Sequence, residues 1–429
     1  MPIYRSRWII NNCFEVNYLK LKICLILLSV VPNLIFSQDN PYKIKKYPFI
    51  NYKANNFAIT DTASYNLLFD KLTQIAFAGE GKVSIVHIGD SHLQADFLSG
   101  NFRRKLQTFF LGAMGGRGFV FPYKVAKTNN PVNYKVLWTG EWQSCRNVEK
   151  EKKCKLGLSG ISVTTADTNA SITISINDPK LSGYDFDRLM VFHEFGQQAY
   201  SPEIYNNSIK KTAFPRKGYT LFEFKNNIES VTLNLKKTDT LQNSFSLYGF
   251  NFDSNDAGII YHTIGVNGAQ VESYLRCQYF VPHLAALNPD WVIVSLGTND
   301  AYTDVFDTLA FKNSIDSIIG FIKQAAPTAA ILFTTPGDHR IRKTKINQNV
   351  QFASNIIIEK TKQHSLSYWD FYRIMGGKGS IDSWYYAGLA HTDYLHYSRK
   401  GYEYQAHLLF NAFLKAYDDY LAKQIILKN

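Results

Sequence analysis

Two short, mostly apolar runs, residues 83–88 and 291–296, constrain the fold of this 429-residue chain most. Each run is followed directly by a glycine and then by polar residues. A six-residue run rich in β-branched side chains and closed by glycine predicts a strand buried on both faces. Such strands belong to mostly parallel sheets that helices cover on both sides. A third run at residues 329–335 fits the same sheet, and helical periodicity occurs over residues 61–78, 311–324, 347–363 and 401–416. We therefore predict an α/β fold with a mostly parallel sheet.

The residues that follow the first two strands carry reactive groups. Gly-Asp-Ser-His at 89–92 follows one strand, and Gly-Thr-Asn-Asp at 297–300 follows the other. Because open α/β sheets keep their sites at the carboxyl ends of strands, we expect Ser91 and Asn299 to lie close together. A serine hydroxyl becomes a useful nucleophile when a histidine takes its proton. The sequence therefore predicts that Ser91 is a nucleophile with a histidine beside it.

Asp393 and His396 fit the roles of orienting carboxylate and base. They are three positions apart at a predicted turn or helix start, so the carboxylate can accept from Nδ1–H and leave Nε2 to face Ser91. The tetrahedral intermediate of such a reaction also needs hydrogen-bond donors for its oxyanion. We expect three donors: the backbone N–H of Ser91, the side-chain amide of Asn299 and the backbone N–H of Gly268 in a glycine-containing loop.

Each of these strings also has a purely structural interpretation. Gly-Asp-Ser is ordinary turn chemistry, Thr or Asn after a glycine often caps a helix, and an Asp-His pair fits a surface loop. The functional interpretation rests on their joint occurrence, in order and at strand ends. His92 either lines the site or has a packing role, and His87 is expected to be a core histidine. No further ligand of the usual spacing accompanies His391, Asp393 and His396, so we predict no metal site.

These blocks resemble those of the SGNH (GDSL-type) hydrolases. The matching positions are Gly-Asp-Ser at Ser91, the glycine block at Gly268, Gly-Thr-Asn-Asp at Asn299, and Asp-x-x-His at Asp393 and His396. Finer details resemble the bacterial peptidoglycan O-acetylesterases: Leu-Gln-Ala-Asp at 93–96, Gly-Val-Asn-Gly-Ala-Gln at 265–270, and Trp-Asp at 369–370 ahead of Met-Gly-Gly at 375–377. The resemblance covers roughly residues 80–120 and 260–415.

The resemblance implies a fold and an activity. The fold is a three-layer α/β/α hydrolase domain, and the activity is removal of acetyl groups from the C6 hydroxyl of N-acetylmuramic acid through an acetyl-Ser91 intermediate, without a cofactor. Three alternatives stay open: a polysaccharide O-acetyltransferase using the same acyl-enzyme, an esterase for xylan-type acetylated polysaccharides, and a glycan-binding protein with an inactive hydrolase fold. The complete set of reactive residues argues against the last.

The middle of the chain has a different pattern. Short alternating runs between turn residues predict a β-sandwich, at residues 161–165, 170–176, 189–192, 219–224 and 231–235, with a loop at 251–256 closing the stretch. We therefore predict a hydrolase domain at 38–129 and 257–429, interrupted by a sandwich at 130–256. The resemblance implies an insertion of carbohydrate-binding-module type. Its Trp138, Trp142, Tyr200 and Tyr205 either stack on sugars or belong to the core, so no glycan-binding residue is assigned.

The N-terminal segment predicts export. Cationic residues precede an apolar run at residues 23–36 that is short and interrupted for a membrane span, so we expect a signal peptide at 1–37 and a periplasmic or secreted protein, with an uncleaved anchor as the alternative. In an oxidising compartment, Cys145 and Cys154 could form one loop-closing disulfide, and Cys277 would then stay free and buried; the sequence leaves open whether the two are bridged.

The charge of the chain bears on its partners. The formal net charge of +12 falls to about +9 after cleavage, because the leader holds four Lys or Arg residues and one Glu. A basic surface attracts anionic polymers, including cell-wall glycans with lactyl or peptide carboxylates. The basic residues are scattered and no nucleic-acid-binding motif stands out, so we predict an O-acetylated glycan substrate, no nucleic acid and no stable membrane span after cleavage. The oligomeric state is left open.

Overall fold

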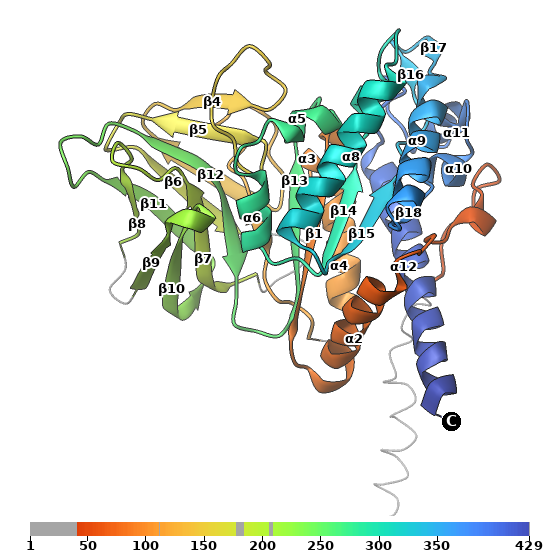
Figure 1. Cartoon of the computed structure of the whole chain (residues 1–429), viewed down its shortest axis with the longest axis horizontal. Coiled ribbons are helices and arrows are strands. Elements are labelled where there is room, and N and C mark those ends of the chain that lie inside the picture. Colours follow the sequence, from red (N-terminus) through yellow and green to blue (C-terminus); the bar gives the residue numbers. More distant parts are fainter. Residues whose placement is uncertain (1–40, 111, 177–183, 206–208, 429) are drawn as a thin grey trace, which may run out of the picture. The chain divides into compact units, whose positions relative to one another are not determined.

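The sheet that positions the predicted strand ends has five strands in the order β13-β1-β14-β15-β18 (Figure 1). Every neighbouring pair in it is parallel. The strands are β1 (Lys82–Gly89), β13 (Gly258–Gly265), β14 (Trp291–Ser295), β15 (Ala330–Thr334) and β18 (Ser367–Trp369). The runs at 83–88, 291–296 and 329–335 are thus confirmed as strands of one parallel sheet, whereas the sequence analysis had no strand for the edge position of β13.

Helices cover both faces of this sheet (Figure 1). One layer holds α2 (Thr62–Ala78), α4 (Phe97–Phe109) and α12 (Arg399–Lys428), and the other holds α5 (Val271–Leu275), α6 (Phe280–Ala286), α8 (Thr308–Ala325) and α9 (Asn349–Gln363). Successive strand residues point to opposite faces. The Trp291 ring accordingly stacks on Phe413 of α12 at 5.7 Å, while Val292 belongs to the same core cluster as Ile315 of α8. The predicted α/β/α arrangement is confirmed.

The four predicted helices are present with shifted ends. Asp61 caps α2, since its side chain accepts from the Ser64 N–H at 3.1 Å, and Gly79 ends the helix in the left-handed region. The largest difference lies at the C-terminus, where the helix predicted at 401–416 extends over Arg399–Lys428 as α12. Short elements complete this part: η1 (Tyr52–Ala54), α3 (Ser91–Gln94), α7 (Thr298–Ala301), α10 (Phe371–Met375), α11 (Ser380–Tyr386), β16 (Arg340–Ile341) and β17 (Lys345–Ile346).

Two antiparallel sheets form the predicted β-sandwich (Figure 1). One has the order β4-β5-β12-β7-β10-β9, with β2 also paired to β12, and the other has the order β3-β6-β11-β8. Their bounds are β2 (Gly118–Val120), β3 (Tyr134–Thr139), β4 (Gln143–Arg146), β5 (Ile161–Thr165), β6 (Ser171–Ile176), β7 (Phe186–His193), β8 (Ser201–Glu203), β9 (Ile209–Phe214), η2 (Pro215–Lys217), β10 (Tyr219–Ile228), β11 (Ser230–Lys236) and β12 (Phe245–Asp253).

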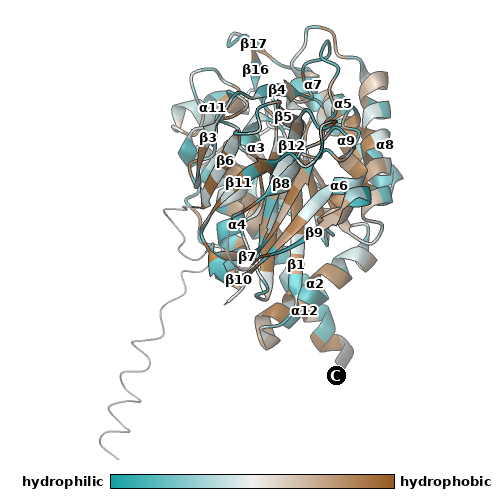
Figure 2. Cartoon of the chain, turned by 90° about the vertical axis from the view of Figure 1, so that its left-hand side faces the viewer, coloured by the Kyte–Doolittle hydropathy of each residue, from teal (hydrophilic) through white to brown (hydrophobic). Residues whose placement is uncertain are grey.

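Alternation of buried and partly exposed residues explains these strands. In β6 every second residue is buried, as expected for a strand with one face on a core. Figure 2 shows hydrophobic residues running along the strands of both parts. The predicted loop at 251–256 is partly wrong, because β12 continues to Asp253 and Asn251 is buried in it, paired in register with Met190 of β7.

The computed structural model describes residues 41–110, 112–176, 184–205 and 209–428, and residues 47–429 form one compact unit. The predicted signal peptide at 1–37 lies outside the described residues. No helix in the described part combines the length and apolar character needed to cross a membrane. Cys145 and Cys154 form a disulfide, which the sequence had left open, and Cys277 is free and buried.

Candidate active site

Three neighbouring strands end in register at one edge of the parallel sheet. Gly89 at the end of β1 pairs with Gly265 of β13 on one side and with Ser295 of β14 on the other. The predicted site residues that follow these ends within four positions are Ser91, Gly268 and Asn299. The sheet therefore brings together, at its carboxyl edge, side chains that are up to about 200 residues apart in the sequence.

Ser91 is the first residue of the short helix α3. Its Oγ lies 2.9 Å from Nε2 of His396, within hydrogen-bonding distance. The preceding residue, Asp90, caps the helix, because its Oδ1 accepts from the His92 N–H at 2.9 Å. This cap fixes the turn after β1 so that the Ser91 side chain meets the histidine.

His396 lies in the loop before α12 and is held by Asp393. Its Nδ1 is 2.8 Å from Oδ2 of Asp393, and the other carboxylate oxygen accepts from the backbone N–H groups of Leu395 and His396, both at 3.0 Å. With the Nδ1 proton on the carboxylate side, Nε2 is the acceptor that faces Ser91. Serine, imidazole and carboxylate thus form one continuous chain of hydrogen bonds.

The surroundings give the neighbouring histidines different pKa values. The hydrogen bond to Asp393 raises the pKa of His396 above its ordinary value, although burial acts in the opposite direction. Burial lowers the pKa of His92 well below the ordinary value, and it lowers the pKa of His339 to about 4. At neutral pH His92 and His339 are therefore uncharged, and His396 is the histidine nearby that gains a proton most readily.

The pKa of Asp393 is also shifted by its hydrogen bond with His396. Burial acts to raise the pKa of Asp393, but the hydrogen bonds from the His396 side chain and from two backbone N–H groups outweigh it and lower that pKa. Asp393 is therefore ionised at neutral pH. An ionised carboxylate stabilises the imidazolium that forms when His396 accepts a proton.

The three expected oxyanion donors differ in their present partners. The backbone N–H groups of Ser91 and Gly268 have no acceptor among the described residues. The Asn299 side-chain amide donates to the carbonyl oxygen of Ala269 at 3.0 Å and to Oδ2 of Asp90 at 3.3 Å. Gly268 has a φ of +82°, a conformation that favours glycine. An oxyanion bound here would meet two free N–H groups and would compete with the longer contact to Asp90.

Two carboxylates of the motifs, the buried Asp90 and the half-buried Asp300, lie close to these donors. Burial raises the pKa of Asp90 to about 6 and that of Asp300 to about 7. Asp300 accepts from the Val271 N–H at 3.1 Å, so it ties the start of α5 to the Gly-Thr-Asn-Asp string. Asp90 and Asp300 are part of the sequence motifs, but their role in joining the strings became visible only in the structure.

Gln94, one turn after Ser91, was missed as a site residue by the sequence analysis. Its Nε2 donates to Oδ1 of Asn129 at 2.7 Å, and its Oε1 accepts from the Asn267 N–H at 2.7 Å. This buried amide therefore connects α3 to the glycine loop that contains Gly268. The signal in the sequence was its place in the Leu-Gln-Ala-Asp string after the predicted nucleophile.

A buried ion-pair cluster supports the same region. Asp96 is almost completely buried and pairs with Arg103 at 3.0 Å and with Arg117 at 2.9 Å. It also accepts from Asn133 at 2.7 Å and from the Thr263 hydroxyl at 3.0 Å. Burial acts to raise the pKa of Asp96, but the two guanidinium groups lower it below its usual range. The cluster links α4, β13 and the start of the sandwich.

The remaining histidine predictions have clear outcomes. His87 is a buried core histidine, as predicted, with Nδ1 2.6 Å from the Tyr261 hydroxyl and Nε2 2.7 Å from Oγ of Ser295. His92 both lines the site and packs within it. Its ring centroid is 5.3 Å from that of His396, and its Nδ1 is 2.9 Å from the Tyr402 hydroxyl. Among the described residues no three His, Cys, Asp or Glu side chains group as metal ligands would.

His339 is a neighbour of the site that the sequence analysis did not name. It is buried, with Nε2 2.9 Å from the Asn347 amide, and a proton on His396 would lower its pKa further. It follows the Pro-Gly-Asp string after β15. Its position after the carboxyl end of a third predicted strand is the signal by which the sequence could have identified it.

The hydrolase part is a three-layer α/β/α fold with a parallel sheet, and a serine lies beside a histidine at the ends of its strands. Residues 241–404 match the family model described as GDSL-like Lipase/Acylhydrolase family. Over this segment the chain is similar to the GDSL-like acylhydrolases, a family of carboxylic ester hydrolases. The match includes Gly268, Asn299, Asp393 and His396, whereas Ser91 lies ahead of the sandwich and outside the matched segment.

Solved structures resemble the chain to different extents. A structure described as a peptidoglycan O-acetylesterase in action has 21% sequence identity and a TM-score of 0.71, with 85% of this chain and 99% of that chain covered. A lipase/acylhydrolase from Enterococcus faecalis has 19% identity and a TM-score of 0.29, covering 36% of this chain and 74% of that one. An acetyl xylan esterase has 18% identity and a TM-score of 0.29, covering 36% and 80%. No curated protein sequence matches the chain significantly.

The first of these structures supports the fold over nearly the whole chain. It covers the parallel sheet and the sandwich together, because 85% of the chain exceeds what either part contains alone. The sandwich inserted before the acylhydrolase segment is therefore a shared feature of fold.

Proposed function

We propose that this protein is a serine esterase that removes O-acetyl groups from a cell-wall glycan through an acetyl-Ser91 intermediate. The observation that carries the proposal is the hydrogen-bonded chain from Ser91 Oγ to His396 at 2.9 Å and from His396 to Asp393 at 2.8 Å. A serine hydroxyl that shares a hydrogen bond with a carboxylate-oriented imidazole is prepared for attack on an ester carbonyl.

In the first half of the reaction, His396 Nε2 takes the proton of Ser91 as Oγ bonds to the acetyl carbon. The carbonyl oxygen gains negative charge, which the N–H groups of Ser91 and Gly268 and the amide of Asn299 stabilise. The bond between the acetyl carbon and the sugar oxygen then breaks. His396 gives its proton to the departing sugar hydroxyl, which leaves acetyl-Ser91.

In the second half, water replaces the sugar. His396 takes a proton from water while the oxygen attacks the acetyl carbon, and the same donors stabilise the oxyanion. Collapse of this intermediate breaks the bond to Ser91 Oγ, which recovers its proton from His396. Acetate leaves and the free enzyme is restored, so every proton that His396 accepts is returned within the cycle.

For the substrate we propose peptidoglycan that carries the acetyl group on the C6 hydroxyl of N-acetylmuramic acid. The likeness of fold to a structure described as a peptidoglycan O-acetylesterase supports this, as it extends over the sandwich as well as the hydrolase part. A second domain beside the site gives a polymeric substrate more surface to rest on than a small ester would need. Among the aromatic residues considered earlier, Trp138 and Tyr205 are exposed and Trp142 and Tyr200 are buried.

For the location we propose the periplasm or the outside of the cell. The Cys145–Cys154 disulfide supports an oxidising compartment, because disulfides are rare in the cytosol. Peptidoglycan is itself outside the cytoplasmic membrane, so location and substrate agree. Detection of the mature protein in a periplasmic extract, with its N-terminus near residue 38, tests this part.

The proposed chemistry is tested with p-nitrophenyl acetate and with two polymers. Ser91→Ala should abolish acetate release, and a fluorophosphonate probe should label the parent enzyme and leave the variant unlabelled. Undiminished hydrolysis by Ser91→Ala would end the assignment of the nucleophile. Acetate release from O-acetylated peptidoglycan should exceed release from acetylated xylan. The reverse preference would overturn the proposed substrate, and acetyl transfer to a sugar in place of water would identify a transferase.

A further inference from the structure

A cationic cavity lies at the junction of the sandwich and the hydrolase part. Its volume is about 680 Å³, and it is lined by the loop at residues 146–155, here called the basic loop, and by the end of α5. The lining contains six cationic side chains against one carboxylate, that of Glu149. The cations are Arg146, Lys150, Lys152, Lys153, Lys155 and Arg276. Like charges gathered around one cavity create a strongly positive local potential.

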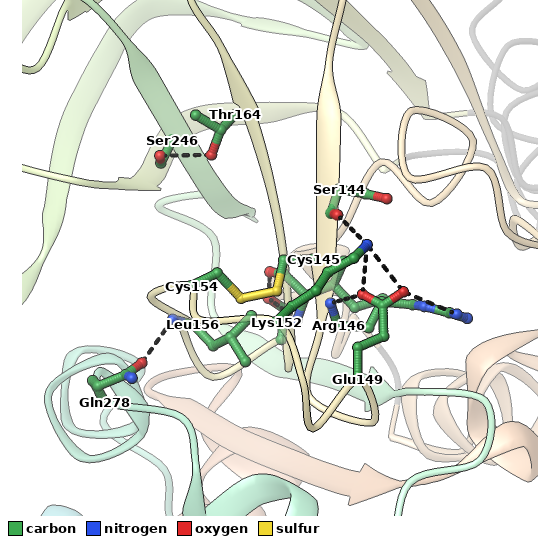
Figure 3. The surroundings of a disulfide bond; sticks show 12 residues. Ser144, Cys145, Arg146, Glu149, Lys152, Cys154, Leu156, Thr164, Ser246 and Gln278 are labelled. Atoms are coloured by element: carbon green, nitrogen blue, oxygen red, sulfur yellow. Dashed lines mark hydrogen bonds and ion pairs between the residues drawn. A yellow bond between two sulfur atoms is a disulfide. The ribbon is translucent and has the colours of Figure 1, made fainter.

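The basic loop is held in one shape by several bonds (Figure 3). The Cys145–Cys154 disulfide closes it. Just after the loop, the Leu156 N–H donates to Oε1 of Gln278 at 2.9 Å, and inside the loop the Asn147 N–H donates to the Gly160 carbonyl at 2.7 Å. Because the backbone is fixed at both ends, the cationic side chains are held near one another in spite of their repulsion.

Several of these cations are already neutralised. Figure 3 shows Glu149 between Arg146 and Lys152, which it meets at 3.5 and 3.2 Å. Outside the cavity, Lys155 pairs with Glu194 at 2.7 Å and Lys150 with Glu272 at 3.5 Å.

Lys153 and Arg276 have no ion-pair partner in the part of the chain that the structure describes. Nε and Nη2 of Arg276 are moreover buried and have no hydrogen-bond partner there. The Arg276 side chain is half-buried, and two of its nitrogens lack the hydrogen-bond partner that buried polar groups ordinarily have. Lys153 and Arg276 are therefore two cations of the lining whose charge no carboxylate of the described residues offsets.

The cavity is next to the candidate active site. Cγ1 of Val148, in the basic loop, lies 4.0 Å from the position that a Cβ on Gly268 would occupy. Arg276 follows directly after α5, a five-residue helix that begins three residues after Gly268. A helix of that length spans about 8 Å. A polymer whose acetyl group is at Ser91 therefore passes within reach of the cavity.

We propose that this cavity is a subsite for carboxylate groups of an anionic glycan whose acetyl ester is presented to Ser91, an inference that rests on the proposed function. The planar guanidinium of Arg276 matches a carboxylate with two parallel N–H···O bonds, and the Lys153 ammonium adds a point charge. A neutral acetylated polysaccharide has no group for this subsite. The cavity thus selects among acetylated glycans for those with carboxylates spaced along the chain.

Binding is measured with the full chain as Ser91→Ala, using peptidoglycan stripped of its esters by mild alkali, in a sedimentation assay. Lys153→Gln and Arg276→Gln should each weaken binding, with about a 10-fold loss for Arg276→Gln because a charge-assisted hydrogen bond is removed. Lys153 is exposed, so its replacement does not threaten the fold. The matched control is Arg216→Gln with Lys225→Gln, which removes one exposed Arg and one exposed Lys of the sandwich outside the cavity.

The controls decide between specific and general attraction. De-esterified peptidoglycan whose carboxyl groups are converted to amides should bind the Ser91→Ala chain weakly. Its binding should be at least as weak as that of de-esterified peptidoglycan with free carboxyl groups to the chain that also carries Arg276→Gln. Equal weakening by the Arg216/Lys225 control pair, or equal binding of the amidated polymer, would overturn the subsite. Because Ser91→Ala binds without turnover, the binding result is independent of the esterase test. If the enzyme with Ser91 intact does not hydrolyse p-nitrophenyl acetate, the proposed function is refuted and the binding measurement still stands.

Discussion

Replacing Asn299 by alanine separates an oxyanion donor from a structural amide. The side chain donates two hydrogen bonds in the free protein, to Ala269 at 3.0 Å and to Asp90 at 3.3 Å. Losing them lowers the free energy of unfolding by about 1–3 kcal/mol, at roughly 0.5–1.5 kcal/mol for each bond. Losing an oxyanion donor costs the transition state about 2.7–4 kcal/mol, which corresponds to roughly 10²–10³-fold in kcat. The two effects are read from different measurements.

The matched control is Asn349→Ala. The Asn349 amide also donates to two backbone carbonyls, those of Ala301 at 3.3 Å and Thr303 at 2.7 Å, so its removal affects stability in a comparable way. Both variants are assayed for urea unfolding and for kcat on p-nitrophenyl acetate. We expect similar losses of stability but a loss of kcat in Asn299→Ala alone. A similar, few-fold change of kcat in both would refute the oxyanion role of Asn299.

Three further predictions test the site and its support. Because neutral His396 is the base and its pKa is raised, kcat/KM should rise through an apparent pKa above about 6.5, and Asp393→Asn should move this limb to lower pH; an unmoved limb would contradict the pairing. Asp96→Asn leaves two buried arginines short of charge and should reduce the free energy of unfolding by roughly 3–5 kcal/mol in urea titrations. Reduction of the disulfide should cost about 2.6 kcal/mol by the loop-entropy relation for a separation of nine positions, so an unchanged urea midpoint with dithiothreitol would argue against a structural role.

The sequence predicted the fold to the extent that local patterns specify it. The runs at 83–88, 291–296 and 329–335 are mostly apolar because nearly all of their residues are buried, and they are strands. The strand β13 was missed because its last residues overlap the glycine-containing block at 264–270. Its place at the edge of the sheet depends on pairing with β1. The loop predicted at 251–256 begins too early for a similar reason, since pairing with β7 extends β12 to Asp253.

The candidate site was predicted in its parts but not in its connections. Ser91, His396 and Asp393 were named from motifs, and the structure places their side chains in contact. Gln94 and His339 were not named, because each has a role only through groups distant in sequence, such as the Asn267 N–H and the Asn347 amide. Their places after predicted strands were a signal in the sequence, but the contacts themselves arise from packing between distant segments.

The sequence alone determined the chemistry that this chain can perform, because reactive groups are covalent properties of named residues: a serine after one strand, an asparagine after another, and an aspartate three positions before a histidine. The tertiary structure decided their geometry. Parallel pairing in register aligned the strand ends. The hydrogen bond to Asp393 raised the pKa of His396, while burial lowered those of His92 and His339. Distance, burial and electrostatic surroundings depend on the whole folded chain, so only the structure could supply them.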